Sequence, residues 1–294
     1  MKKKYLVTGA SGFLGSHIAD ILSNHGYDVC LFDKKISKFK QHKQKMFIGN
    51  INNLNHIIKV SKNVEAIFHF AATADLKAAN EDPFQTIENN IIGTVKILKA
   101  CLKNKVKKII FASSIYARSE QGGFYSTSKL VSEMLIERFC KKYKIKFVIL
   151  RFGTIYGERA NDFNTVQKFI NDATSSKKIV RNSIGHESRN YIHVLDVAKL
   201  TLELLKKKYE NKYYNIFGKK NFFVKDLLKI IKKNIPSLKL KFSKVDNREF
   251  NYKVNPFSYK IREGKNFVKG KYISLDQGVK NLIEKSLSME DQNN

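Results

Sequence analysis

The sequence predicts an α/β protein with a doubly wound parallel sheet and a smaller C-terminal lobe. Over roughly the first 150 residues, apolar runs of strand length alternate with segments of helical length, as expected of repeated strand–helix–strand crossovers. A glycine-rich turn joins the first apolar run to the first helical segment. After Gly157 the alternation becomes irregular, which indicates that a second lobe begins there.

Each expected strand is a short apolar run of the kind that a parallel sheet buries on both faces. These runs are Lys4–Thr8, Tyr27–Phe32, Met46–Ile48, Ala66–Phe70, Lys108–Phe111, Phe147–Leu150 and Tyr213–Ile216. Helices are expected from the glycine turn to Ser23, over Pro83–Asn104, up to Tyr143, over Thr165–Ala173 and Leu195–Lys207, after Phe222 and over Leu275–Ser286. We therefore assign residues 1–154 and 191–217 to the sheet domain, residues 155–190 and 218–288 to the smaller lobe, and residues 289–294 to a polar tail.

The composition indicates a folded protein in a reducing compartment. Of the 294 residues, 43% are hydrophobic, which is enough for a sizeable core. The three cysteines, Cys30, Cys101 and Cys140, form no CxxC pair, so neither a disulfide framework nor a metal site is expected. The sequence contains no apolar run long enough for a membrane span and no signal-peptide pattern. We expect a cytoplasmic protein without a membrane segment.

The net charge of +29 comes mainly from lysines. A nucleic-acid-binding surface usually combines a basic arm or stripe with aromatic and arginine residues that stack on bases. Here the lysines are scattered along expected helix ends and polar faces, for example at Lys107–Lys108, Lys141–Lys142, Lys206–Lys208 and Lys232–Lys233. We interpret the charge as a compositional bias, so that nucleic acid is not an expected partner. The positive field would still attract an anionic substrate.

The turn after the first strand predicts a phosphate-binding site. Its glycines follow the spacing Gly9-x-x-Gly12-x-x-Gly15. The first glycine permits a tight turn, the second lets the backbone approach a pyrophosphate, and the third allows close packing of helix on strand. The helix that begins near Phe13 and Leu14 then presents its N-terminus to the phosphates.

An acidic residue at the end of the second strand predicts the choice of cofactor. Asp33 follows the glycines at close to the expected distance of about 20 residues, where a carboxylate binds the adenosine ribose. A carboxylate there would repel the 2′-phosphate of NADP, so NAD is favoured. The neighbouring Lys34 and Lys35 leave NADP open as an alternative.

The fourth expected strand leads into two small residues. Ala71 and Ala72 would let a cofactor lie close to the backbone. His69 lies within this apolar strand, and we expect a packed, hydrogen-bonded histidine there rather than a catalytic one.

The stretch that ends at Lys129 predicts catalytic chemistry. An apolar strand delivers Ser113 and Ser114 to the carboxyl edge of the sheet, where open α/β sheets place their ligands. Tyr125 and Lys129 follow at an i, i+4 spacing, which puts both on one face of a helix. A lysine cation, helped by an oxidised nicotinamide, would lower the phenol pKa from its ordinary value of about 10. Tyr125 could then act as a base on an alcohol, although such a pair also occurs by chance on amphipathic helices.

Taken together, these motifs resemble those of extended short-chain dehydrogenases/reductases, specifically the nucleotide-sugar epimerase/dehydratase group. The similarity covers essentially the whole chain. The motifs are Thr8-Gly9-x-x-Gly12-x-x-Gly15, Asp33, His69-Phe70-Ala71-Ala72, Asn90-Ile91-Ile92-Gly93-Thr94, Ser113-Ser114, Tyr125-x-x-x-Lys129, Leu150-Arg151-x-x-Thr154-x-Tyr156-Gly157 and Arg189-x-Tyr191-Ile192-His193-Val194-x-Asp196-Val197-Ala198. The resemblance implies a Rossmann-type fold, with Tyr125 as base, Lys129 as ribose ligand and pKa modifier, and Ser114 as hydroxyl partner.

The resemblance also implies which residues surround the ligands. The expected cofactor site comprises Gly9, Gly12, Phe13, Leu14, Gly15, Asp33, Asn50, Ile51, Ala71, Ala72, Asn90, Ser113, Tyr125, Lys129 and Thr154. The expected substrate site comprises Ser114, Asn164 and Arg189. Arg189 matches a position that contacts the nucleotide diphosphate, with a loop-bracing arginine as the alternative.

The implied activity is that of an NAD-dependent enzyme acting on a nucleotide-activated sugar. The preferred reaction is 4-epimerisation through a transient 4-keto sugar. A 4-reductase or 4-dehydrogenase of the same family would need the same residues. An alternative from another class is a catalytically silent Rossmann protein that binds RNA through its basic surface, against which the intact Ser/Tyr/Lys set argues.

Several positions depart from the family pattern. The loop after the serines is short, and Ile115 and Tyr116 stand where the dehydratase branch has an acidic residue. Glu120 is the nearest carboxylate, and we interpret it as a loop residue. Cys101 does not match the cysteine of the 3,5-epimerase/reductase branch. Asn50 replaces an aspartate near the adenine, and the short loop leaves the sugar open.

The resemblance further implies a homodimer, formed by the helices near 83–104 and 125–143 as a four-helix bundle. Ile97, Leu98, Leu130, Met134 and Leu135 are the apolar residues expected on their outward faces. Burial within the monomer is the competing explanation for these five.

Overall fold

The structure is a computed structural model that describes residues 2–181, 183–243, 251–260, 277 and 279–281. The chain divides into two compact units, residues 1–259 and 260–294. In the second unit, Gln277 and residues 279–281 are helical. Most of the helix expected over 275–286, and the whole tail at 289–294, lie outside the described residues.

The first unit is built on a sheet of seven strands, in which every neighbouring pair is parallel. The strands are β1 (Lys4–Thr8), β2 (Asp28–Asp33), β3 (Lys45–Ile48), β4 (Ala66–His69), β5 (Lys108–Ser114), β6 (Lys146–Phe152) and β11 (Lys212–Ile216). Across the sheet their order is β3-β2-β1-β4-β5-β6-β11. The strand order reverses between β1 and β4, which is where such sheets bind their ligands. The predicted fold class and all seven predicted strands are confirmed.

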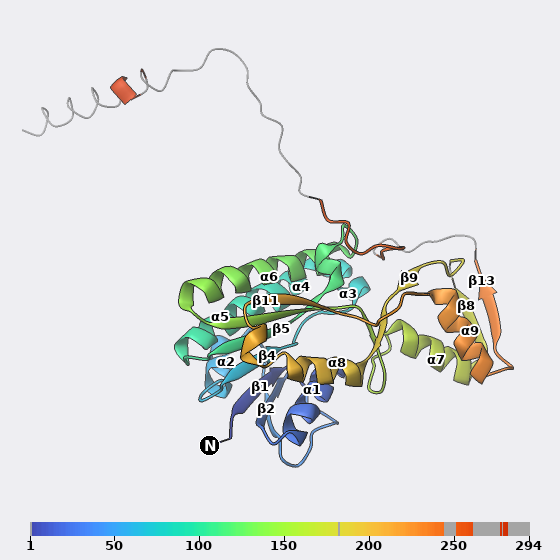
Figure 1. Cartoon of the computed structure of the whole chain (residues 1–294), viewed down its shortest axis with the longest axis horizontal. Helices are drawn as coiled ribbons and strands as arrows, with labels where there is room; N and C mark the ends of the chain where they lie inside the picture. Colours follow the sequence, from blue (N-terminus) through green and yellow to red (C-terminus); the bar gives the residue numbers. More distant parts are fainter. Residues whose placement is uncertain (1, 182, 244–250, 261–276, 278, 282–294) are drawn as a thin grey trace, which may run out of the picture. The chain divides into compact units, whose positions relative to one another are not determined.

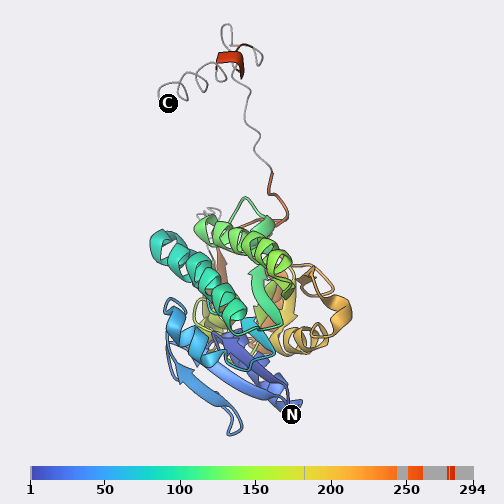
Figure 2. The same ribbon diagram turned by 90° about the vertical axis from the view of Figure 1, so that its left-hand side faces the viewer.

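Helices cover both faces of this sheet (Figures 1 and 2). One face carries α1 (Phe13–Asn24) and α8 (Val194–Glu203), and the other carries α2 (Leu54–Val60), α5 (Gly93–Lys103) and α6 (Gly123–Tyr143). Alternate residues of β1 face opposite cores, because strand side chains point to opposite faces. Tyr5 and Val7 pack in the cluster that contains Ile18 of α1, whereas Leu6 packs in the cluster that contains Ile97 of α5.

The long helix expected over Pro83–Asn104 is interrupted. Its first part is α4 (Pro83–Ile87), followed by a π-helical turn at Glu88–Ile92 and then by α5. At this turn the Asn90 carbonyl accepts hydrogen bonds from the Thr94 hydroxyl at 2.6 Å and from the Ser132 hydroxyl of α6 at 2.9 Å. π turns of this kind are frequent at functional sites, and this one holds two helices together beside the candidate site.

The smaller lobe has a core of its own. Its helices are α7 (Thr165–Ser175) and α9 (Val224–Asn234), and its strands β8 (Lys178–Arg181) and β13 (Lys239–Phe242) pair in parallel. Phe169, Ile179 and Leu228 are buried at the centre of this core. Two small strand pairs complete the first unit: β7 (Thr154–Tyr156) with β10 (Tyr191–His193), and β9 (Ser188–Arg189) with β12 (Phe222–Phe223).

The apolar residues expected on the outward faces of α5 and α6 divide into two groups. Ile97 and Leu98 are fully buried in the monomer core, so their expected outward position was wrong. Met134 is 48% exposed, and Leu130 and Leu135 are half-buried. The core takes the first pair because α5 packs tightly between α2 and the sheet.

Among the residues that the structure describes, no helix is both long and apolar enough to cross a membrane. Cys30, Cys101 and Cys140 are free and buried.

Candidate active site

The turn between β1 and α1 leaves room for phosphates. Gly9 adopts a φ of +70°, and a Cβ atom there would lie 2.6 Å from the Ala71 nitrogen. A Cβ atom on Gly15 would overlap the Gly9 carbonyl oxygen. Gly12 stands at the N-cap of α1 and offers no side-chain cap, so the first N–H groups of the helix have no partner within it. These groups and the helix dipole form an anion site of the expected kind.

Asp33 ends β2 beside this turn. Its carboxylate accepts hydrogen bonds from the Ser11 backbone N–H at 2.9 Å and from the Lys35 backbone N–H at 3.3 Å. These bonds hold the carboxylate at the rim of the glycine turn, and lone pairs remain for ribose hydroxyls.

A cavity of about 640 Å³ extends from the glycine turn to the end of β5. Most of the predicted site residues line it: Gly9, Gly12, Phe13, Leu14, Gly15, Asp33, Ile51, Ala71, Ala72, Ser113, Ser114, Tyr125, Lys129 and Asn164. Four predicted residues are not among its lining: Asn50, Asn90, Thr154 and Arg189. The structure therefore gathers the predicted catalytic residues and the glycine turn around one space.

The two asparagines outside the lining support the walls. The Asn50 side chain accepts a hydrogen bond from the Asn52 backbone N–H at 2.9 Å. Asn90 is buried, and its side chain receives the Thr73 N–H at 2.8 Å and donates to Ser128 of α6 at 2.9 Å. Asn90 therefore fixes the segment after β4 against α6, while Asn89 lines the cavity.

Two residues of the smaller lobe that were predicted to contact the substrate make contacts within the protein itself. Arg189 is buried, donates to the Ser188 carbonyl at 2.7 Å, and stacks its guanidinium 4.2 Å from the centre of the Tyr252 ring. Asn164 caps α7 by accepting two backbone N–H groups, although it does line the cavity.

Ser114 and Tyr125 form the polar centre of the cavity. Ser114 ends β5, and Tyr125 lies in the first turn of α6. Burial raises the pKa of the Tyr125 phenol to about 12, and a hydrogen bond with Ser114 acts in the opposite direction. The lowering expected from Lys129 and an oxidised nicotinamide concerns the cofactor-bound enzyme; in the chain alone, desolvation outweighs the contact with Ser114.

Lys129 lies one turn further along α6 and is 4% exposed. Its ammonium donates to the Ala112 carbonyl at 2.7 Å and lies 5.8 Å from the centre of the Tyr125 ring. Burial lowers the pKa of Lys129 to about 8, and the Glu133 carboxylate acts to raise it. The buried ammonium is therefore held close to the phenol, and the nearby carboxylate favours its charged form.

Glu133 is a supporting residue that the sequence analysis missed. It is 1% exposed and accepts hydrogen bonds from the Ser113 hydroxyl at 2.5 Å and from two nitrogens of Arg151, at 2.9 and 2.6 Å. Its place four residues after Lys129, on the same helical face, was the available signal. This bidentate pair joins α6 to the ends of β5 and β6 directly behind the site.

His69 is a packed histidine, as expected. Its ring nitrogens lie 2.9 Å from the Thr8 hydroxyl and 3.1 Å from the Thr94 hydroxyl. Burial, and to a smaller extent the charge of Lys129, lower its pKa to about 3. The neutral ring ties β1 to β4 and α5, and it has no free nitrogen for catalysis.

The loop after Ser114 is covered by a segment from the other end of the first unit. The Tyr116 hydroxyl donates to Asn251 at 3.0 Å, and its ring centre lies 5.1 Å from that of Tyr252 and 6.3 Å from that of Tyr125. The Tyr259 N–H donates to the Arg118 carbonyl at 3.0 Å. Residues 251–259 thus form a cover over the short loop.

These features define a dinucleotide-dependent enzyme of the Rossmann class. The glycine cradle, the free helix N-terminus and Asp33 fit the phosphates and ribose of NAD, and the Ser/Tyr/Lys set fits an alcohol to be oxidised. The sequence profile of the NAD dependent epimerase/dehydratase family matches residues 5–216. The chain belongs to this family of nucleotide-sugar enzymes, and its cofactor is NAD.

Individual relatives carry out different reactions. A putative UDP-glucose 4-epimerase of Methanocaldococcus jannaschii is 31% identical over 251 residues, which cover 78% of this chain and 82% of the relative. A UDP-N-acetyl-alpha-D-glucosaminuronate decarboxylase of Bacillus cytotoxicus is 30% identical over 244 residues, covering 74% and 75% of the two chains. The crystal structure of UDP-glucose 4-epimerase from Thermotoga maritima with UDP-glucose superposes with a TM-score of 0.79 at 25% identity, covering 87% of this chain and 90% of that one.

Proposed function

We propose that the chain is an NAD-dependent 4-epimerase of a nucleotide-activated sugar, and that it acts through a transient 4-keto sugar. The observation that carries this proposal is the joint presence of Ser114, Tyr125 and Lys129 in one cavity with the glycine cradle. The likeness to the Methanocaldococcus and Thermotoga proteins favours a uridine diphosphate sugar.

The proposed mechanism assigns one role to each side chain. NAD, held by the glycine turn and Asp33, would supply a reversible hydride acceptor. Tyr125 takes the proton of the C4 hydroxyl and later gives it back, and Ser114 hydrogen-bonds the same oxygen. Lys129 favours the phenolate through its charge, since an opposite charge stabilises the ionised form. The 4-keto sugar must turn over between the two transfers, which leaves the opposite configuration at C4.

A dehydratase reaction is less well supported, because no carboxylate directly follows Ser114 in the sequence. Ile115 is buried, and the hydroxyl of Tyr116 is engaged by Asn251. The carboxylates among the described lining residues are Asp33, which bonds the glycine turn, and Asp75, which caps a helix. Neither occupies the position next to the active-site hydroxyl.

A product assay tests this proposal. Purified protein is incubated with NAD and separately with UDP-glucose, UDP-galactose, and UDP-glucuronic acid, and the sugars are separated by chromatography. We expect the two neutral sugars to converge on one equilibrium mixture without net NADH. Stoichiometric NADH would instead indicate a 4-dehydrogenase, and carbon dioxide from the uronic acid would indicate a decarboxylase. Failure of every sugar tested to change, in protein that binds NAD, would contradict an epimerase for these substrates.

We also propose a homodimer formed through α4 and α6, which contact each other. Phe84 of α4 is 82% exposed and Met134 of α6 is 48% exposed, and exposed apolar surface of this kind marks interfaces. Solution scattering at micromolar concentration should give twice the chain mass of 33.9 kDa. Met134→Glu should shift the mass toward the monomer, whereas Leu195→Glu, at an equally exposed site on α8, should not. A monomeric wild-type protein would rule the dimer out.

A further inference from the structure

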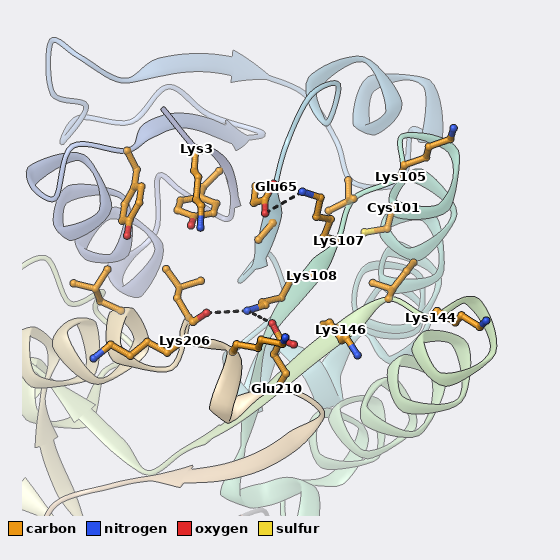
Figure 3. Close-up of a pocket in the computed structure, with 18 of the residues that line it drawn as sticks. Lys3, Glu65, Cys101, Lys105, Lys107, Lys108, Lys144, Lys146, Lys206 and Glu210 are labelled. Carbon is orange, nitrogen blue, oxygen red and sulfur yellow. Dashed lines mark hydrogen bonds and ion pairs between the residues drawn. The ribbon is translucent and has the colours of Figure 1, made fainter. Parts of the chain in front are cut away.

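A second cavity, of about 1,010 Å³, lies at the amino-terminal edge of the sheet (Figure 3). Its lining comes from the segments that precede or open β1, β4, β5 and β6, and from α8 with the residues after it. The cofactor cavity lies at the carboxyl ends of the same strands. The two cavities are therefore separated by the length of the sheet, and both can be occupied at once.

This groove is strongly basic. Nine lysines line it together with only three glutamates: Lys3, Lys105, Lys107, Lys108, Lys144, Lys146, Lys199, Lys206 and Lys207 against Glu65, Glu203 and Glu210. Each glutamate already pairs with a lysine, at 3.1 Å for Glu65 with Lys107. Within the described part of the chain, the other six lysines make no ion pair: Lys3, Lys105, Lys144, Lys146, Lys199 and Lys207. All six are exposed.

Stabilisation of helix ends does not account for this cluster. Lysines complement the negative end of a helix dipole only within its last turn or so. Lys105 and Lys144 follow the ends of α5 and α6 and fit that role. Lys3 and Lys146, in contrast, stand at the beginnings of strands, and Lys199 lies within α8. Three of the six unpaired charges therefore need another explanation.

The chemistry of the lining indicates the kind of anion. Its described residues include no arginine, asparagine or glutamine, so it lacks the forked and amide groups that read base edges or clamp a single carboxylate. Lysine is depleted in protein–protein interfaces, and a flat bilayer cannot enter a concave groove. Lysine ammoniums along a groove do suit the backbone of a flexible phosphate chain. Tyr27 and Tyr143 line the groove with part of their rings exposed and could stack on bases.

We propose that this groove binds single-stranded nucleic acid through its phosphate backbone, without sequence preference. The fold brings to one place nine lysines that lie scattered along the sequence. The proposal does not depend on the reaction assigned to the cofactor cavity, because the groove shares no lining residue with that cavity.

The test uses the full chain with saturating NAD and a fluorescein-labelled oligouridylate of about 20 nucleotides, a length that exceeds common single-strand site sizes. Anisotropy titrations at several salt concentrations compare the wild type with Lys3→Gln/Lys146→Gln/Lys207→Gln. The control, Lys220→Gln/Lys232→Gln/Lys233→Gln, removes the same charge from exposed positions in the smaller lobe. Thermal melts verify that both variants fold.

We expect the groove variant to bind at least about tenfold more weakly and to lower the salt slope by about 2, the value for three lost phosphate contacts on a single strand. The control should change the affinity by less than threefold, a threshold of roughly 0.7 kcal/mol. Equal losses in both variants would show that only the net charge attracts the oligonucleotide, and would overturn the groove. Equally effective displacement by polyglutamate, or no binding by the wild type at low salt, would also overturn the proposal.

Discussion

Tyr125→Phe should lower turnover by about 10²–10⁴-fold, the usual contribution of a positioned acid–base group. The change removes the hydroxyl that Ser114 contacts and keeps the ring that packs near Tyr116. NAD binding, measured by calorimetry, should stay nearly unchanged because the phenol acts on the sugar. Near-normal turnover in a folded Tyr125→Phe protein would rule out Tyr125 as the base.

Substitutions at neighbouring residues distinguish the roles of Ser114, Tyr125 and Lys129. Tyr116→Phe is the matched control, since it removes a phenol 6.3 Å away, ring centre to ring centre, whose hydroxyl bonds Asn251 and not Ser114. It should leave most of the turnover intact.

Lys129→Ala should weaken NAD binding and shift the pH–rate profile upward, because the charge that favours the phenolate is gone. Ser114→Ala should reduce turnover without a comparable effect on NAD.

Glu133→Ala should lower the free energy of unfolding by about 3–5 kcal/mol, the range for breaking a buried ion pair by removal of one partner. Its carboxylate is buried with Arg151, and their closest N–O distance is 2.6 Å. The substitution would leave the Arg151 charge without its partner and the Ser113 hydroxyl without its acceptor. Urea denaturation monitored by circular dichroism measures the change.

Glu137→Ala is the control for this substitution. Glu137 lies one turn further along α6, pairs with Lys141, which is 68% exposed, and accepts a hydrogen bond from the Tyr213 hydroxyl at 2.7 Å. An exposed pair contributes at most about 1 kcal/mol and a hydrogen bond of this kind about 1 kcal/mol, so the expected loss stays below that of Glu133→Ala. If Glu133→Ala proved as mild as Glu137→Ala, the ion pair behind the site would not be a main support of α6.

The sheet was predictable because each strand carries its own signal. Buried parallel strands such as β4 and β5 contain uninterrupted apolar runs, Ala66–Phe68 and Ile109–Ala112, and the glycine turn follows β1 directly. The residues proposed to be catalytic could be singled out because their spacing within α6 and their place after β5 are local. The topology of the sheet then places the glycine turn and these residues together at the carboxyl edge of the sheet.

Contacts between distant segments were not predictable in the same way. Glu133 looks like any helical glutamate until Arg151 and Ser113 are placed against it. Asn90 turned out to bond Thr73 and Ser128, because the π turn directs its side chain to them. The burial of Ile97 was likewise not predictable from the sequence, because it depends on how α5 packs against the sheet.

Residues 251–259, which cover the short loop, and the sheet with its helices tolerate substitutions to different extents. Tyr116 and Tyr252, far apart in sequence, pack on each other, and the Tyr116 ring lies beside that of Tyr125. The described residues 251–260 belong to no helix or strand, so the backbone pairing of the sheet places no demand on their side chains. Successive substitutions in this segment can change the packing beside Tyr125 while the residues proposed to transfer the proton, on β5 and α6, stay as they are. One scaffold can thereby give rise to enzymes that share a reaction centre and differ in the sugars they accept.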